Sequence, residues 1–145
     1  MLRKLQKSDI EELEKRLNAL SDEDKKMYHP HPFTKETLEK LIDIDYDYYF
    51  VKISNGKIVG YSMLRTFGKY TIPTYGQVIW EEFRGKGFGS QILEETINEA
   101  KNLGFGIVKL KVYEHNEVAY NLYIKHGFKK IGVEGDEIWM QRDLF

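Results

Sequence analysis

The fold of this 145-residue chain is decided by the stretch Gln77-Val-Ile-Trp-Glu-Glu-Phe-Arg-Gly-Lys-Gly-Phe-Gly-Ser90. A β-rich run passes through a charged corner into three alternating glycines, Gly85, Gly87 and Gly89. Apolar residues then recur at three- and four-residue steps, which predicts a helix from Gly87 to Leu103. This order places unpaired backbone N–H groups at the start of a helix, where the helix dipole favours an anion.

The glycine turn favours a phosphate-bearing ligand because Arg84 and Lys86 alternate with the glycines. A plain strand–helix turn without a ligand is the alternative. A Walker A loop needs Ser or Thr after Gly-Lys, but Gly87 follows Lys86, so Mg²⁺-ATP chemistry is disfavoured. A dinucleotide fingerprint needs a glycine where Ser90 stands, and the acidic residue expected about 20 positions further on is also missing.

The remaining pattern, Arg84-x-x-Gly87-x-Gly89, resembles the acetyl-coenzyme A signature of the GNAT superfamily of N-acetyltransferases. The block Asn116-Glu-Val-Ala-Tyr-Asn-Leu-Tyr123, followed by Gly127-Phe128, is similar to that family's N-x-x-A-x-x-x-Y motif and its Gly-Phe turn. The separation of the two motifs fits one helix plus one strand. Two motifs in the right order are more specific than either alone, and the resemblance covers about residues 50–140.

Composition is that of an ordinary globular enzyme. A chain of this length with 41% hydrophobic residues can bury one core, so we expect a single domain over residues 1–145. A net charge of −1 argues against a nucleic-acid partner. The absence of cysteine excludes disulfides, thiolate metal sites and a Cys nucleophile, and we predict no metal. Without an apolar run of membrane-spanning or signal-peptide length, we expect a cytoplasmic protein with no membrane partner.

Local signals predict the order of the elements. Ser8-Asp-Ile-Glu11 has the form of a capping box, Ser21 and Thr34 are candidate N-caps, and Asn55-Gly56 is a strong hairpin signal. Tyr46 to Ile53 is predicted as a strand with Tyr48 and Phe50 on one face and Tyr49 and Val51 on the other. The predicted strands are 2–5, 46–53, 57–67, 75–81, 107–113, 128–133 and 137–142, with helices after Ser8, Ser21 and Thr34 and at 87–103 and 116–126. This order resembles the GNAT fold, an α+β arrangement with a mixed, mostly antiparallel sheet and helices on both faces.

The resemblance implies where acetyl-coenzyme A would bind. In the GNAT fold two central strands splay apart, and the pantetheine arm lies in the wedge like an added strand. The diphosphate would then lie on the amides of the glycine turn. The residues implied to bind the coenzyme are Gln77, Val78, Ile79, Arg84, Gly85, Lys86, Gly87, Phe88, Gly89, Ser90 and Asn116.

Tyr123 is the catalytic residue that the resemblance implies, as the proton donor to the departing thiolate. A phenol of ordinary pKa, about 10, is protonated at neutral pH. A place in the core is the alternative, because Ala119, Leu122 and His126 share its helical face. Asn116 is also a preferred helix N-cap, and the two roles are compatible.

The general base is not identified by the sequence. In the ribosomal-protein N-terminal alanine acetyltransferases a glutamate stands five residues before the motif asparagine, and here that residue is Lys111. A lysine there disfavours a protein N-terminal acceptor. An ordered chain of water molecules is an alternative to a side-chain base. The candidate bases are Glu81, Glu82, Glu114, His115, His29 and His31.

We therefore expect an acetyl-CoA-dependent N-acetyltransferase in which an acceptor amine attacks the thioester directly. The acceptor is a small-molecule or peptide amine, with a small molecule favoured. Asp43, Asp45 and Asp47 are a faint hint of a polycationic acceptor. The alternative is a non-catalytic acetyl-CoA-binding sensor or interaction module, and homodimer formation is left open.

Overall fold

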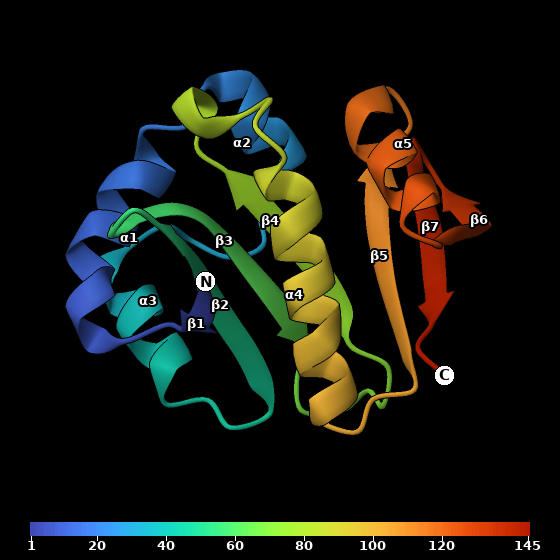
Figure 1. Ribbon diagram of the computed structural model, residues 1–145, viewed down its shortest axis with the longest axis horizontal. Coiled ribbons are helices and arrows are strands. Elements are labelled where there is room, and N and C mark those ends of the chain that lie inside the picture. The colour runs from blue at the N-terminus through green and yellow to red at the C-terminus, as the bar shows by residue number, and fades with distance from the viewer.

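The computed structural model describes residues 1–145 as a seven-stranded mixed sheet with helices on both faces (Figure 1). The strand order is β1-β2-β3-β4-β5-β7-β6, and every neighbouring pair is antiparallel except β4 and β5. The expected fold class is confirmed. The strands are β1 (Leu2–Lys4), β2 (Asp47–Ser54), β3 (Lys57–Arg65), β4 (Thr74–Ile79), β5 (Ile107–Tyr113), β6 (Lys129–Glu134) and β7 (Glu137–Asp143).

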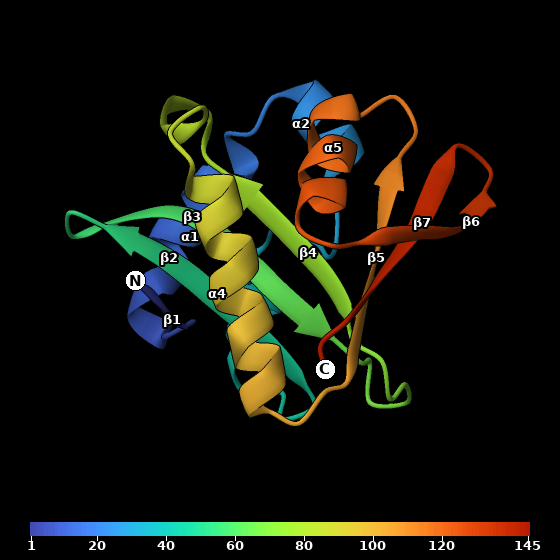
Figure 2. The ribbon, with the colours of Figure 1, turned by 45° about the vertical axis from the view of Figure 1, so that its right-hand side comes forward.

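Five α-helices and two short 3₁₀ turns complete the chain. Helices α1 and α3 cover β2 and β3 on one face, while α4 and α5 lie on the opposite face (Figure 2). None of the helices combines the length and the apolar content needed to cross a membrane. The helices are α1 (Ile10–Asn18), α2 (Asp22–Met27), α3 (Lys35–Ile42), α4 (Phe88–Asn102) and α5 (Glu117–Lys125), and the turns are η1 (Lys7–Asp9) and η2 (Glu81–Phe83).

The two predicted N-caps and the predicted hairpin turn are confirmed by the structure. The Ser21 side chain accepts a hydrogen bond from the Asp24 amide at the start of α2, and the Thr34 side chain does the same for α3. Asn55 and Gly56 have positive φ angles of 51° and 74°, as the hairpin between β2 and β3 requires.

The predicted start of the first helix is wrong. Ser8 does not cap it; instead the Asp9 carboxylate accepts from the Gln6 amide (2.8 Å) and pairs with Arg3 (2.7 Å). A 3₁₀ turn therefore precedes α1, which begins at Ile10. Arg3 belongs to β1, so a tertiary contact favours the cap formed by Asp9 over the predicted cap formed by Ser8.

Side chains of the strands alternate between two cores. Tyr49 and Val51 belong to the core under α1 and α3, whereas Phe50 belongs to the core under α4 and α5 and Tyr48 packs against it. The predicted alternation of β2 is therefore confirmed. The second core also contains side chains from β4 and β5, so it holds these two strands in place at the centre of the sheet.

Polar contacts fix the position of α4 on the sheet. Thr96 and Ser62 of β3 share a hydrogen bond of 2.8 Å that is fully buried. Lys52, which is 4% exposed, pairs with Glu95. A buried charge must be paired to be tolerated, so this contact specifies the rotation of α4 about its axis.

Gly60 controls how closely β3 and β4 approach. A Cβ atom there would lie 2.6 Å from Ile79 Cδ1 and 2.8 Å from the Val78 carbonyl oxygen. We predict that Gly60→Ala lowers the free energy of unfolding by about 1–3 kcal/mol, because a backbone atom must shift. Gly132→Ala is the matched control, since nothing lies within 4 Å of its Cβ position. Urea denaturation of both variants checks this, and equal stabilities would contradict it.

Candidate active site

β4 and β5 separate along their length (Figure 1). They pair in parallel at Thr74 and Lys109, and the Lys109 amide also donates to the Pro73 carbonyl (3.1 Å). Beyond this point the strands diverge around a cavity of about 740 Å³. Its walls come from β4, the glycine turn, the first turn of α4, β5, α5 and the end of α2. The cavity thus occupies a wedge in the middle of the sheet.

The edge of β4 that faces the wedge has unpaired backbone groups. The Trp80 amide donates to the Val59 carbonyl of β3 (3.0 Å). Because backbone groups alternate in direction along an antiparallel pair, the amide and carbonyl of Val78 also point to β3, and those of Gln77 and Ile79 point into the wedge. Gln77 and Ile79 can therefore receive an added strand, whereas the backbone of Val78 cannot.

The glycine turn presents amide groups to the same cavity. Gly85 and Gly87 have φ angles of 76° and 86°, which favour glycine, and no atom lies within 4 Å of either Cβ position. Gly87 is the N-cap of α4, and no side chain accepts from the first turn of that helix. The N–H groups of Phe88, Gly89 and Ser90 consequently have no partner within the helix. A glycine cradle with free amides at a helix start fits a diphosphate.

The two basic residues of the turn lie differently from each other. Arg84 Nε donates to the Ile79 carbonyl (2.9 Å), and its guanidinium pairs with Asp24 of α2 (3.0 Å). Arg84 therefore joins the turn to α2. It also occupies the Ile79 carbonyl, so that of the two backbone groups of Ile79 only the amide is left for a ligand. Lys86 does not line the cavity; its ammonium lies 5.8 Å from the centre of the Phe83 ring.

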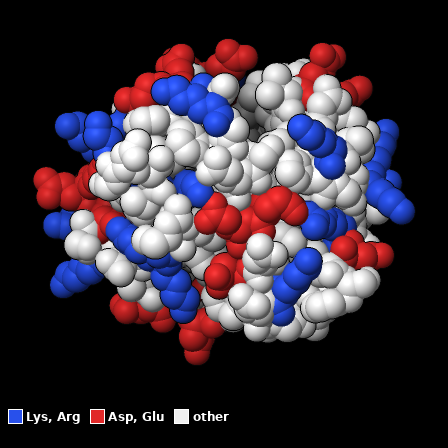
Figure 3. Space-filling model, in the orientation of Figure 1, with Lys and Arg blue, Asp and Glu red and all other residues white.

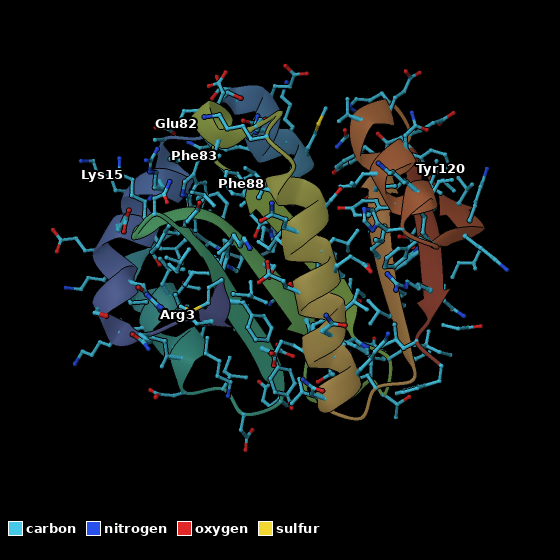
Figure 4. The ribbon with its side chains drawn as sticks, viewed as in Figure 1. Arg3, Lys15, Glu82, Phe83, Phe88 and Tyr120 are labelled. Atoms are coloured by element: carbon cyan, nitrogen blue, oxygen red, sulfur yellow. The ribbon has the colours of Figure 1, made fainter.

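Aromatic side chains and basic groups surround the outer end of the wedge. Figure 4 shows Phe83 and Phe88 beside the start of α4, and their rings meet edge to face at 6.4 Å. A hollow at the top of Figure 3 marks the opening, with blue Lys and Arg side chains on both sides. Arg84 and Lys125 are among the residues that line it. Positive groups at this end suit an anionic ligand.

Asn116 and Tyr123 lie on the far wall, at opposite ends of α5. The Asn116 side chain caps the helix by accepting from the Ala119 amide (3.3 Å) and also lines the cavity. Tyr123 is 8% exposed, and its ring packs edge to face on Tyr75 (6.4 Å) and Phe128 (5.8 Å). Burial raises the pKa of Tyr123 well above its usual value, so the phenol keeps its proton at neutral pH.

Lys111 lies on the face of β5 opposite α5 and lines the cavity. Its ammonium pairs with Glu134 (3.2 Å) and Glu137 (3.5 Å). Burial acts to lower the pKa of Lys111, but these carboxylates outweigh it and raise the pKa. The lysine is thus charged and compensated, so it repels an approaching cation less than the sequence alone indicates.

The structure separates the two histidines of the His29-Pro-His-Pro segment. His29 is exposed and its Nε2 lies 3.1 Å from the Tyr113 hydroxyl, at the edge of the cavity. His31 is half-buried among the aromatic rings of Phe33, Tyr49 and Tyr61. Its Nδ1 lies 2.8 Å from the Pro32 carbonyl oxygen and its Nε2 3.1 Å from the Tyr61 hydroxyl. Of these two, only His29 is placed to exchange a proton with a ligand.

The acidic candidates are less well placed. Glu82 pairs with Arg16 of α1 (2.5 Å), and neither Glu81 nor Glu114 lines the cavity. Asp47 is buried and accepts from the amides of Thr66 (2.6 Å) and Phe67 (2.9 Å). This carboxylate therefore holds the loop after β3 and offers no site for a polycation.

Several residues of the cavity wall were not predicted from the sequence. Ser90 was predicted, but its contact was not: the Ser90 hydroxyl lies 3.0 Å from His126 Nε2 and joins α4 to α5. A helical spacing of three or four residues from Asn116 would have identified the α5 wall, whereas no local signal points to α2. The unpredicted lining residues are Asp24, Met27, Tyr28, Tyr75, Gly76, Phe83, Val112, Tyr113, Val118, Ala119, Asn121, Leu122 and Lys125.

The sequence profile of the acetyltransferase (GNAT) family matches residues 15–128. The chain belongs to the GNAT family. YwnH of Bacillus subtilis, provisionally named a phosphinothricin acetyltransferase, is 33% identical over 91 residues, which cover 59% of this chain and 55% of YwnH. The N-alpha-acetyltransferase RimI of Mycobacterium tuberculosis is 26% identical over 107 residues, covering 70% of this chain and 65% of RimI. The chain thus spans about 55% to 65% of the lengths of these two relatives.

Solved structures of the family share the fold closely. The PaiA N-acetyltransferase of Thermoplasma acidophilum, solved in complex with coenzyme A, superposes with a TM-score of 0.81 at 21% identity. The superposition covers 99% of this chain and 98% of that one. At this level of identity the likeness establishes the arrangement of the elements.

His31 should make stability depend on pH. Burial, partly opposed by the Pro32 carbonyl, lowers the pKa of His31 below its unfolded value of about 6.5. The unfolded chain therefore takes up the proton more readily, and stability is lost as the pH falls through this value. We predict that His31→Gln flattens the change in the free energy of unfolding between about pH 7.5 and 5.5.

His29→Gln is the control for this prediction, because His29 is exposed and should leave the pH dependence unchanged. Urea denaturation at both pH values measures the effect. A His31→Gln variant with the same pH dependence as the wild type would contradict the assignment.

Proposed function

We propose that this chain is an acetyl-CoA-dependent N-acetyltransferase that transfers acetyl directly to an acceptor amine. One observation carries the proposal. A single cavity joins an uncapped helix N-terminus, an unpaired strand edge and a buried tyrosine. These are the three features needed to hold a diphosphate, a pantetheine arm and a thioester.

Each part of the coenzyme has a matching group in the chain. The amides from Gly85 to Ser90 would bind the diphosphate, and Arg84 and Lys86 add positive potential. The backbone groups of Gln77 and the amide of Ile79 would pair with the pantetheine amides. Asn116 uses its Oδ1 atom as a cap, which leaves its amide N–H₂ group to contact the same arm.

Tyr123 is the proton donor in this proposal. Acetyl-CoA supplies the thioester, and transfer forms an N–C bond while the C–S bond breaks. The phenol holds its proton firmly because burial disfavours phenolate. The same low-polarity surroundings disfavour a thiolate, so the sulfur that departs beside Tyr123 is a stronger base than it would be in water.

The acceptor would approach from the face of the sheet that carries Lys111 and Tyr113. His29 is the candidate base, acting directly or through the Tyr113 hydroxyl, because a neutral imidazole nitrogen can accept a proton from an amine. The His29–Tyr113 contact closes part of this side of the cavity. A small amine therefore fits better than a folded protein terminus.

The coenzyme assignment predicts selective thermal stabilisation. Acetyl-CoA at about 100 times its Kd should raise the melting temperature by about 5–10 °C, because it binds only the folded state. ATP and NAD should raise it much less. Gly87→Val should abolish the shift because its side chain would obstruct the amides, whereas Gly104→Val should retain it.

Gly104 is a matched control because its φ of 90° imposes the same backbone strain, and it lies at the other end of α4. Differential scanning fluorimetry measures all of these shifts. Equal stabilisation by NAD would rule out the assignment of the turn to coenzyme A.

The role of Tyr123 predicts a specific kinetic defect. Tyr123→Phe should lower kcat by about 10²–10⁴-fold, the range for acid–base groups, while the affinity for acetyl-CoA changes little. The assay follows free thiol released from acetyl-CoA over a panel of small amines. Unchanged turnover would move the proton donor elsewhere. Binding of acetyl-CoA without transfer to any amine would favour the sensor alternative.

A further inference from the structure

His126, the C-cap residue of α5, contacts α4 with both nitrogens of its ring. Its Nε2 atom lies 3.0 Å from the Ser90 hydroxyl, and its Nδ1 atom lies 3.4 Å from Glu94 Oε2. Ser90 lines the cavity in the first turn of α4, whereas His126 does not line it. The histidine can therefore act on a ligand in the cavity through the serine hydroxyl that it contacts.

The charged groups around His126 come from three elements. Glu94 of α4 accepts hydrogen bonds of 2.8 and 3.0 Å from Arg142 of β7. This guanidinium holds the pKa of the Glu94 carboxyl below its usual value. On α5 itself, Lys125 directly precedes His126 and lines the cavity. The carboxylate that faces Nδ1 is therefore ionised at neutral pH and can only accept a hydrogen bond.

These surroundings favour one tautomer of the neutral imidazole. Because Nδ1 faces an acceptor, it carries the proton, and Nε2 is left with its lone pair. Ser90 then donates its hydroxyl proton to Nε2, and the hydroxyl has only lone pairs to offer to the cavity. In this state Ser90 repels the phosphate oxygens that the neighbouring amides would bind.

Protonation of His126 reverses this hydrogen bond. An imidazolium donates from both nitrogens, so Nε2 then donates to the Ser90 oxygen. The hydroxyl proton is released and can be donated to an anion in the cavity. The positive charge of the imidazolium also adds to the helix dipole at the start of α4. Both changes strengthen the binding of a diphosphate.

We propose that His126 is a positioning residue for the coenzyme: by taking up a proton from solvent at Nε2, it makes the Ser90 hydroxyl a hydrogen-bond donor to the diphosphate. The inference rests on the proposed function. Coenzyme binding and protonation of His126 favour each other, since linkage between two binding events is reciprocal. The affinity is therefore highest at low pH and falls as the pH rises through the range in which histidines titrate, about pH 5–8.

Acetyl-3′-dephospho-CoA is the probe that isolates this effect. It keeps the diphosphate but lacks the 3′-phosphate, a group that itself titrates at about pH 6. Isothermal titration calorimetry should give a Kd about tenfold larger at about pH 8 than at about pH 6, the effect of one charge-assisted hydrogen bond. Titrations in buffers of different ionisation enthalpy should show net proton uptake on binding.

Two variants separate the histidine from the serine. His126→Gln removes the titrating group and should give the same Kd at both pH values, with no proton uptake. Ser90→Ala leaves α5 unchanged and should lose most of the tenfold difference. Lys125→Gln is the matched control, because it removes a lasting positive charge from the neighbouring residue. It should raise the Kd equally at both pH values and keep the pH dependence.

The outcomes distinguish this inference from the proposed function. A wild-type Kd that is equal at both pH values, without proton uptake, would overturn the role of His126 while coenzyme binding stands. A pH dependence that survives in folded His126→Gln or Ser90→Ala would also overturn it. If the wild type does not bind the probe at either pH, the inference fails together with the proposed function.

Discussion

The backbone hydrogen bonds that β4 and β5 do not make are the constraint on which the rest of this structure depends. Central parallel strands usually pair along their whole length, and an unpaired strand edge can form backbone hydrogen bonds with another extended chain. Here pairing stops after Thr74 and Lys109, so Gln77 and Ile79 turn unpaired groups into a cavity. A buried backbone group needs a partner, and an extended ligand with amide groups supplies one.

Side-chain contacts connect the two sides of the wedge where the backbone does not. Ser90 meets His126 between α4 and α5, and His29 meets Tyr113 between the α2–α3 segment and β5. The guanidinium of Arg84 meets Asp24 between the glycine turn and α2. Contacts of this kind at the rim can rearrange around a ligand while the buried cores keep the strands in place.

The sequence predicted the elements well because the signals are local. Asn55-Gly56 sets its own turn, and Thr34 caps its own helix. The prediction failed where a distant partner intervened, as when Arg3 drew the Asp9 carboxylate into a cap in place of Ser8. The register of the strands could not be read from the sequence either. The register between β3 and β4 turns the backbone of Val78 toward β3. Pairing of β5 with β7 places the Glu137 carboxylate beside Lys111, where it compensates the charge of the lysine.

The candidate site likewise divides into residues that local motifs indicate and residues that only the fold brings in. Motifs indicated Tyr123 and the glycine turn, whereas α2 has no motif and contributes Tyr28 only through the fold. The contact between His126 and Ser90 joins two helices through side chains far apart in sequence. Residues that act through long-range contacts leave no periodic pattern, and only the packed structure brings them together.

Amide hydrogen exchange along β4, measured by NMR with and without acetyl-CoA, shows whether the edge of β4 is unpaired and receives the coenzyme. We expect the amides of Gln77 and Ile79 to exchange quickly in the free protein and to become protected when the coenzyme binds. The Val78 amide between them should be protected in both states, because it pairs with β3. Protection of Gln77 and Ile79 without ligand, or no change on binding, would show that this edge does not pair with the coenzyme.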